Sequence, residues 1–163
     1  MCTVVTVREP QLGPVRIMTT HLEFYSKPQR MAQAKAVRAL HAEYTALALA
    51  PPEESTDGSP FQSKVHTAEA ILCGDFNLQP HEPEYAELTG PGAPGLLWDS
   101  WRLLHGEAPH QPTFLVHDRS YGPDPIACDF VFVSDGLKDR VRRIEIDGAT
   151  QASDHQPVLV DCS

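Results

Sequence analysis

The sequence contains no apolar run that approaches the roughly 20 residues required to span a membrane, so we expect no transmembrane segment. Residues 1–4 lack the basic and then apolar pattern of a signal peptide, and we therefore expect a cytoplasmic protein. No C-x-x-C pair is present among the four cysteines. This spacing favours buried, reduced thiols at Cys2, Cys73, Cys128 and Cys162 over a disulfide framework or a zinc site.

The sequence also lacks an excess of basic residues. Thirteen Lys and Arg face 22 Asp and Glu, which gives a formal net charge of −9. Proteins that track many phosphates usually carry a basic face, so this balance disfavours a non-specific DNA-binding protein. A small phosphodiester, a lipid headgroup or a short oligonucleotide remains compatible with it. The length of 163 residues and the 41% hydrophobic content predict a single domain over residues 1–163.

Alternating β-branched residues over 3–8 and 15–22, with a turn-like segment between them, predict a β-hairpin. Ser26 is a candidate helix cap, and Pro28 fits the first turn of a helix over 28–49. The apolar stripe of this helix consists of residues three or four positions apart: Met31, Ala34, Val37, Leu40, Tyr44 and Leu47.

The rest of the chain predicts alternating strands and short helices, and hence an α/β fold built of layers. Residues 51–66 are rich in Pro, Ser and charge and predict a solvated loop, whereas residues 83–88 predict a short helix. Residues 96–104 are ambiguous, with a helix favoured. The predicted strands are residues 70–73, 113–116, 129–133, 141–146 and 157–160.

Polar residues interrupt or end several of these strands, where an unpaired ionisable group would be costly to bury. Asp75 and Asn77 are two residues apart, so on an extended chain both point to one side while Phe76 points into the core. The carboxylate of Asp75 could bind a hard cation or accept a proton from water, and the amide of Asn77 could donate to a phosphoryl oxygen. The alternative is an Asp/Asn turn after the strand.

Asp129 begins the most hydrophobic strand, and His155 is the natural partner for its charge. Ser153, Asp154 and His155 are consecutive, and three adjacent side chains cannot form a Ser–His–Asp relay, which disfavours a serine hydrolase. We expect Asp154 to face a metal and His21 to face a phosphate. The alternatives are a capped turn before the last strand, a solvated Asp129 and a structural His21.

These segments, in this order, resemble the endonuclease/exonuclease/phosphatase superfamily. The matching segments are Thr20-His21-Leu22, Gly74-Asp75-Phe76-Asn77, Asp129-Phe130-Val131-Phe132 and Ser153-Asp154-His155. The resemblance implies a two-sheet β-sandwich flanked by helices, one or two Mg²⁺ or Mn²⁺ ions, and phosphoester hydrolysis by in-line attack of water.

By resemblance, the candidate catalytic residues are His21, Asp75, Asn77, Asp129 and His155. Asp75 resembles the general base or a metal ligand, and Asn77 resembles the residue that orients the nucleophile. Asp154 is similar to the C-terminal metal carboxylate of the family, so the implied metal ligands are Asp75 and Asp154. His155, polarised by Asp129, would bind the scissile phosphate, and His21 would support it.

The sequence departs from the family pattern at its start. Family members begin with a strand that carries an Asn and continue to a strand that carries a Glu, and these two residues hold the principal metal. The first asparagine here is Asn77, and Glu9 lies in the predicted hairpin turn. We therefore expect an N-terminally truncated domain, with a weak or inactive site and an open core that could self-associate. The alternative is a catalytically inactive remnant with at most a binding role.

Overall fold

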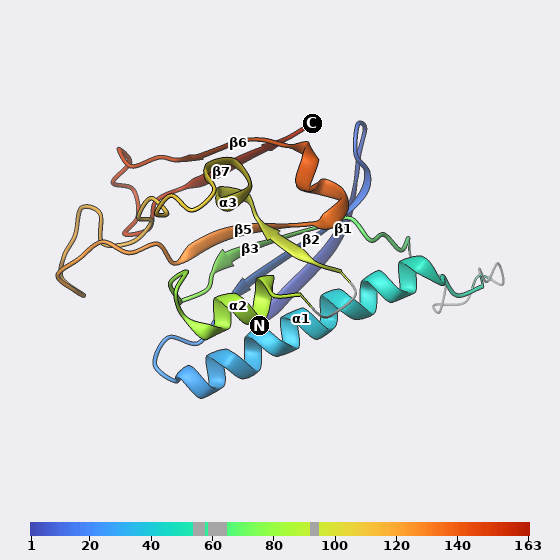
Figure 1. Ribbon diagram of the computed structural model, residues 1–163, viewed down its shortest axis with the longest axis horizontal. Coiled ribbons are helices and arrows are strands. Elements are labelled where there is room, and N and C mark those ends of the chain that lie inside the picture. The colour runs from blue at the N-terminus through green and yellow to red at the C-terminus, as the bar shows by residue number, and fades with distance from the viewer. Residues whose placement is uncertain (54–57, 59–64, 92–94) are drawn as a thin grey trace.

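The computed structural model describes residues 1–53, 58, 65–91 and 95–163, which form two sheets and four helices (Figure 1). The central sheet has the strand order β1-β2-β3-β5-β4, and the second sheet pairs β6 with β7. The strands are β1 (Cys2–Glu9), β2 (Gly13–His21), β3 (Ala70–Asp75), β4 (Leu97–Asp99), β5 (Asp129–Ser134), β6 (Val141–Ile146) and β7 (Val158–Cys162). The helices are α1 (Lys27–Leu49), α2 (Pro83–Thr89), α3 (Ser100–His105) and the 3₁₀ helix η1 (Asp135–Arg140). This arrangement confirms the expected α/β class with two sheets and flanking helices.

The central sheet lies between two layers, with α1 and α2 on one face and the β6–β7 sheet on the other (Figure 1). Alternating residues of each strand fill these two layers. Met18 of β2 and Leu72 of β3 pack in the helical layer with Phe132 of β5. Their neighbours Ile71 and Val133 pack in the opposite layer, which reaches β6 and β7. Strands buried on both faces explain the continuous apolar runs in the sequence.

Helix α1 begins and ends close to its predicted limits. The hydroxyl of Ser26 accepts a hydrogen bond from the main-chain N–H of Gln29, and Pro28 lies in the first turn. The predicted apolar stripe is only partly the buried face, because Ala34 and Val37 are buried whereas the other stripe residues are partly exposed. Polar residues occupy the rest of the buried face, namely Arg30, Arg38, His41 and Thr45.

Ion pairs and hydrogen bonds explain much of this polar face. Arg30 forms ion pairs with Glu82 and Glu84 at the start of α2. Arg38 donates to the carbonyl oxygens of Leu88 and Gly90 at the end of α2. The two buried arginines of α1 therefore hold both ends of the short helix α2. The apolar periodicity of the sequence does not predict these contacts.

Two predicted elements differ from the structure. Residues 96–104 divide into the short strand β4 and helix α3, with Asp99 capping the helix through its side chain. The predicted strand over 113–116 is wrong, because only Phe114 forms isolated bridges, to Ile126 and to His155. Leu115 has a φ of 58°, a left-handed conformation that interrupts an extended chain. The predicted loop over 51–66 lies mostly outside the described residues.

At its edge of the sheet, β1 leaves Val5 and Val7 exposed, while Glu9 caps the hairpin turn by accepting from the main-chain N–H groups of Gln11 and Leu12. The expected self-association through such apolar surface stays a prediction. All four cysteines are free thiols, as predicted, but only Cys128 is buried and the other three are partly exposed. Among the described residues, no helix combines the length and apolarity that crossing a membrane requires.

Candidate active site

Three of the predicted site residues lie in one row across the ends of neighbouring strands. Strand β2 runs parallel to β3 with His21 opposite Asp75, and β3 runs antiparallel to β5 with Asp75 opposite Asp129. Residues directly opposite each other in neighbouring strands have their Cβ atoms only about 5 Å apart. The last residues of β2 and β3 and the first residue of β5 therefore bring an imidazole and two carboxylates together.

His155 joins this row from the segment that precedes β7. Its Nδ1 is 2.8 Å from Oδ2 of Asp129, and its Nε2 is 3.9 Å from Oδ2 of Asp75. The ring also stacks on Phe114, with 4.6 Å between centroids. Because the backbone of Phe114 bridges that of His155, the loop around Phe114 fixes both the position and the plane of the imidazole.

Burial and the neighbouring charges shift the pKa values of Asp75 and His155. Burial raises the pKa of Asp75, and the charge of Asp129 raises it further, although the main-chain N–H of Asn77 and the two histidines act in the opposite direction. Burial lowers the pKa of His155, but the hydrogen bond and charge of Asp129, together with Asp75, outweigh this and raise its pKa above the ordinary value. The site thus holds a more basic carboxylate beside a histidine that favours its protonated form.

His21 and Asn77 complete the predicted cluster in different ways. Nε2 of His21 is 3.3 Å from Oδ2 of Asp75, and its side chain is 73% exposed, so the ring is accessible from solvent. Asn77 has a φ of 51°, and its main-chain N–H donates to Oδ1 of Asp75. The predicted extended geometry of Asp75 and Asn77 is therefore wrong, because the chain forms an Asx turn there. The Asn77 amide nitrogen donates to the carbonyl oxygen of Leu22, which uses one of its two N–H groups.

Asp154 is exposed, and its carboxylate accepts a hydrogen bond from the hydroxyl of the neighbouring Ser153. The negative charge of Asp154 is one of the causes that raise the pKa of His155, so this carboxylate acts electrostatically on the imidazole. Its role as a metal ligand stays a prediction. Ser153 accepts from the main-chain N–H of His155 and not from its ring, which agrees with the predicted absence of a serine relay.

Cys128 and Thr113 also contact the cluster, although sequence reasoning did not select them. The buried Thr113 hydroxyl accepts from the main-chain N–H groups of Cys128 and Asp129, and so it fixes the start of β5. The Cys128 thiol donates to Oδ2 of Asp129 at 3.5 Å. Burial raises the pKa of this thiol, and the charges of Asp129 and Asp75 raise it further. In the sequence, the position of Cys128 directly before Asp129 is the feature that could have pointed to this contact.

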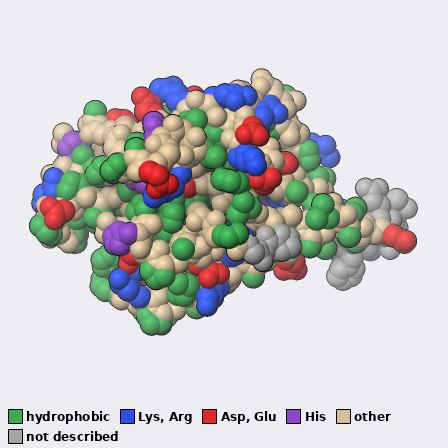
Figure 2. Space-filling view, viewed as in Figure 1, with side chains coloured by type: hydrophobic (Ala, Val, Ile, Leu, Met, Phe, Trp, Pro, Cys, Tyr) green, Lys and Arg blue, Asp and Glu red, His purple; other side chains and the backbone are tan. Residues whose placement is uncertain are grey.

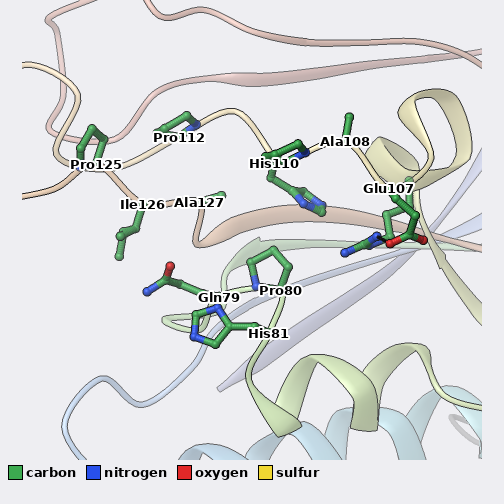
Figure 3. Close-up of a pocket in the computed structure, with 12 residues that line it drawn as sticks. Gln79, Pro80, His81, Glu107, Ala108, His110, Pro112, Pro125, Ile126 and Ala127 are labelled. Atoms are coloured by element: carbon green, nitrogen blue, oxygen red, sulfur yellow. Dashed lines mark hydrogen bonds and ion pairs between the residues drawn. The ribbon is translucent and has the colours of Figure 1, made fainter.

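A pocket of about 380 Å³ is lined by the segment that follows Asn77 and by the segment that precedes Asp129 (Figure 3). Figure 3 shows Gln79, Pro80 and His81 on one side and His110, Pro112 and Ile126 on the other. Gln79 follows Asn77 by two residues and Ala127 precedes Asp129 by two, so about 7 Å of chain separates the pocket walls from the site.

A buried polar network fixes one wall of the pocket. Oδ2 of Asp99 accepts the hydroxyl of Tyr85 at 2.6 Å and is 2.5 Å from Nε2 of His110. Arg102 donates to the hydroxyl oxygen of Tyr85 and pairs with the exposed Glu107 at 2.6 Å. On the face shown in Figure 2, acidic and basic side chains are interspersed, so the net negative charge does not form one acidic surface there.

Comparison of the sequence with known protein families identifies the family of this chain. The sequence pattern of the Endonuclease/Exonuclease/phosphatase family matches residues 10–155, and the chain belongs to this family. No curated protein matches the chain by sequence. Enzymes of the family generally depend on a divalent metal.

Solved structures of the same fold cover almost the entire chain. An endonuclease/exonuclease/phosphatase from Bacteroides vulgatus shares 20% identity at a TM-score of 0.69, covering 99% of this chain and 54% of its own. The mannosyl-6-phosphatase of Bacteroides thetaiotaomicron shares 21% identity at a TM-score of 0.67, covering 99% and 56%. Truncated Caenorhabditis elegans TDP2 shares 21% identity at a TM-score of 0.63, covering 95% and 56%. The chain spans about half the length of these structures, and at such identities the likeness establishes the fold alone.

Proposed function

We propose that this chain carries the phosphate-binding and proton-transfer part of a metal-dependent phosphoester hydrolase of the phosphodiesterase, nuclease or phosphatase type. The observation that carries the proposal is the row of His21, Asp75 and Asp129 across three strand ends, with His155 held on Asp129. Family membership supports the reaction class. Water would attack the phosphorus in line with the leaving oxygen.

Asp75 is the candidate general base. Its carboxylate is partly buried and its pKa is raised, which makes it a better proton acceptor at neutral pH than an exposed aspartate. The Asx turn fixes Oδ1 through the main-chain N–H of Asn77, so Oδ2 is the oxygen that faces the two histidines. A water molecule held beside Oδ2 would lose its proton to Asp75 as it attacks.

His155 is the candidate phosphate donor. Because its Nδ1 is bound to Asp129, its Nε2 is the nitrogen available to a phosphoryl oxygen. The raised pKa favours the imidazolium, whose positive charge would stabilise the charge that develops on phosphoryl oxygens in the transition state. The exposed ring of His21 lies on the other side of Asp75 and could donate to a second oxygen.

A divalent cation, Mg²⁺ or Mn²⁺, fits this site in part. Asp75 offers a hard oxygen ligand, and the neighbouring charge of Asp129 is a second negative charge that a cation would offset. Asp154 is the second predicted ligand, and its side chain is exposed to solvent. Mg²⁺ often binds through one or two carboxylates, several waters and the substrate phosphate, so the fit predicts weak binding without substrate. The ion would supply charge neutralisation of the phosphoryl group.

The competing proposal is a catalytically inactive chain that at most binds a partner. It is favoured if Asp75 is the one protein carboxylate that reaches the ion, because a single carboxylate holds a metal poorly. Hydrolysis assays distinguish the two proposals. The substrates are bis-p-nitrophenyl phosphate, a short DNA and mannose 6-phosphate, the last chosen because one structural neighbour is a mannosyl-6-phosphatase.

We expect slow hydrolysis that requires Mg²⁺ or Mn²⁺ and stops on addition of EDTA. Asp75→Ala and His155→Ala should each lower the rate at least ~10²-fold, the scale of a lost base or transition-state donor. Asp161→Asn, at an exposed carboxylate on β7, is the matched control and should leave the rate unchanged. Absence of turnover with every substrate and metal would favour the inactive chain, and equal rates in all variants would place the activity elsewhere.

A further inference from the structure

The Cys128 thiol contacts Asp129, which also binds His155. The proposed roles of Asp129 and His155 in hydrolysis do not require this thiol. Its side chain is almost fully buried, and its Sγ is 3.5 Å from the same Oδ2 that Nδ1 of His155 approaches at 2.8 Å. One ligand atom from each of the three residues lies within 4.8 Å of the other two. In the described ranges, this is the one such group of three metal-ligating side chains.

We propose that Cys128, Asp129 and His155 form a binding site for a thiophilic transition-metal ion such as Zn²⁺, distinct from a hard-cation site at Asp75. Zinc sites that keep an open position use three protein ligands and a water. Zn–S bonds of about 2.3 Å and Zn–N or Zn–O bonds of about 2.0 Å imply spacings of about 3.5 Å between S and O and about 3.3 Å between N and O in a tetrahedron. The sulfur–oxygen spacing matches directly, and the nitrogen–oxygen spacing has to widen by about 0.5 Å. The sulfur and nitrogen atoms lie within 4.8 Å of each other and have to reach about 3.5 Å.

The chemistry of the donors selects the ion. A thiolate and an imidazole are soft or borderline ligands that favour Zn²⁺ or Co²⁺, whereas Mg²⁺ prefers oxygen alone. Burial among negative charges opposes ionisation of the Cys128 thiol, and a divalent ion that replaces the thiol proton offsets that cost. The thiol proton and the Nδ1 proton of the imidazolium pass to solvent, and the neutral imidazole then keeps its proton on Nε2. Asp129 and His155 are partly exposed, so an ion can reach the site.

Occupation of this site would affect catalysis directly. The ion would take Oδ2 of Asp129 and Nδ1 of His155, and the histidine could no longer be held in its protonated form. This consequence rests on the proposed function, whereas binding of the ion does not. We therefore expect Zn²⁺ to inhibit an enzyme that Mg²⁺ or Mn²⁺ supports.

Titration of the full chain with Co²⁺ tests the site, because a thiolate bound to Co²⁺ gives a charge-transfer absorption band in the near ultraviolet. We expect this band in the native chain and its displacement by Zn²⁺. Cys128→Ser should abolish the band and weaken Co²⁺ binding at least ~10-fold, the scale seen when a metal site loses a contributing group. Cys162→Ser, at a half-buried thiol on β7, is the matched control and should retain both.

Several results would overturn the inference. They are the absence of a thiolate band in the native chain, its persistence in Cys128→Ser, and its equal loss in Cys162→Ser. If Cys128→Ser fails to give the native circular dichroism spectrum, His155→Gln serves in its place, because the partly exposed ring is also a ligand and its loss should weaken Co²⁺ binding to a similar degree. Unchanged binding in His155→Gln counts against the site.

Inhibition by Zn²⁺ is measured separately, because it tests the effect of the ion on hydrolysis and not binding of the ion itself. In the presence of Mg²⁺, Zn²⁺ should slow the native chain and should slow Cys128→Ser at least ~10-fold less effectively, each relative to its own zinc-free rate. A Co²⁺ band in a chain that shows no hydrolysis would support the metal site and contradict the proposed function. Hydrolysis without a Co²⁺ band would do the reverse.

Discussion

The pair formed by Asp129 and His155 can be tested through its energy. In Asp129→Asn the histidine keeps an acceptor oxygen but loses the neighbouring negative charge. With 2.8 Å between Nδ1 and Oδ2, the charge centres lie about 4 Å apart, and two unit charges at that distance attract by ~4 kcal/mol at an effective dielectric constant of about 20. The two side chains are 31% and 18% exposed, so solvent screens part of this attraction. We expect a net loss of ~1–2 kcal/mol in the free energy of unfolding.

The pH dependence of this loss gives the sharper test. The pKa of His155 is raised in the folded protein, so its stabilising contribution is complete below the unfolded value of 6.5 and is lost as the pH rises through the folded value. Asp129→Asn should therefore cost most near pH ~6 and much less near pH ~9. Urea unfolding at both pH values measures the cost, and an NMR titration should show a lower pKa for His155 in the variant.

The exposed carboxylate of Asp161 provides the control. Asp161→Asn should change the stability little, and equally at the two pH values, because its nearest cationic partner, Arg143, is 3.8 Å away at the surface. An equal cost of Asp129→Asn at both pH values, or an unchanged pKa of His155, would refute the assignment of Asp129 as the group that charges the histidine.

Three further substitutions test the backbone conformation at Gly74, the buried ion pair of Arg30 with Glu84, and the role of His21. Gly74→Ala should destabilise the chain by at least ~2 kcal/mol in urea unfolding, because φ is 144° there and a Cβ would overlap the carbonyl oxygen of Thr20. Arg30→Met should cost ~3–5 kcal/mol by leaving Glu84 buried without its cation, and Arg30→Met combined with Glu84→Leu should recover much of that loss; additive costs would contradict the pairing. His21→Ala should alter the melting temperature little, since the ring is exposed, yet lower the hydrolysis rate measurably; a normal rate would remove His21 from the site.

The sequence predicted most strands and the long helix because their apolar patterns reflect burial. Both strands of the N-terminal hairpin, helix α1 and the strand that begins at Asp129 lie close to their predicted residues. The segment over 113–116 failed because its β-branched and aromatic residues suggest a strand, whereas tertiary contacts of Phe114 with Ile126 and His155 determine its conformation. Local propensity cannot anticipate a residue such as Leu115 in the left-handed region.

Four residues predicted for the site, His21, Asp75, Asp129 and His155, lie together in the structure, whereas the local geometry at Asn77 differs from the prediction. The pairing of Asp129 with His155 was predicted from the cost of an unpaired carboxylate on an apolar strand, and the structure joins the two at 2.8 Å. Asn77 was expected on an extended chain, and the Asx turn at Asp75 places it differently. Cys128 was interpreted as a buried thiol alone, because a single sequence does not reveal that its Sγ lies 3.5 Å from Oδ2 of Asp129.

The core pattern and the site geometry have a common origin in strand register. A slip of β3 by one residue against β2 would place Gly74 opposite His21 and would move Leu72 from the helical layer to the opposite layer. The loss of buried apolar area from such a slip would be several kcal/mol for Leu72 and its neighbours together. The alternation of residues that fills the two layers therefore also holds His21, Asp75 and Asp129 in one row. The spacing of these three residues across the strands follows from the strand register alone.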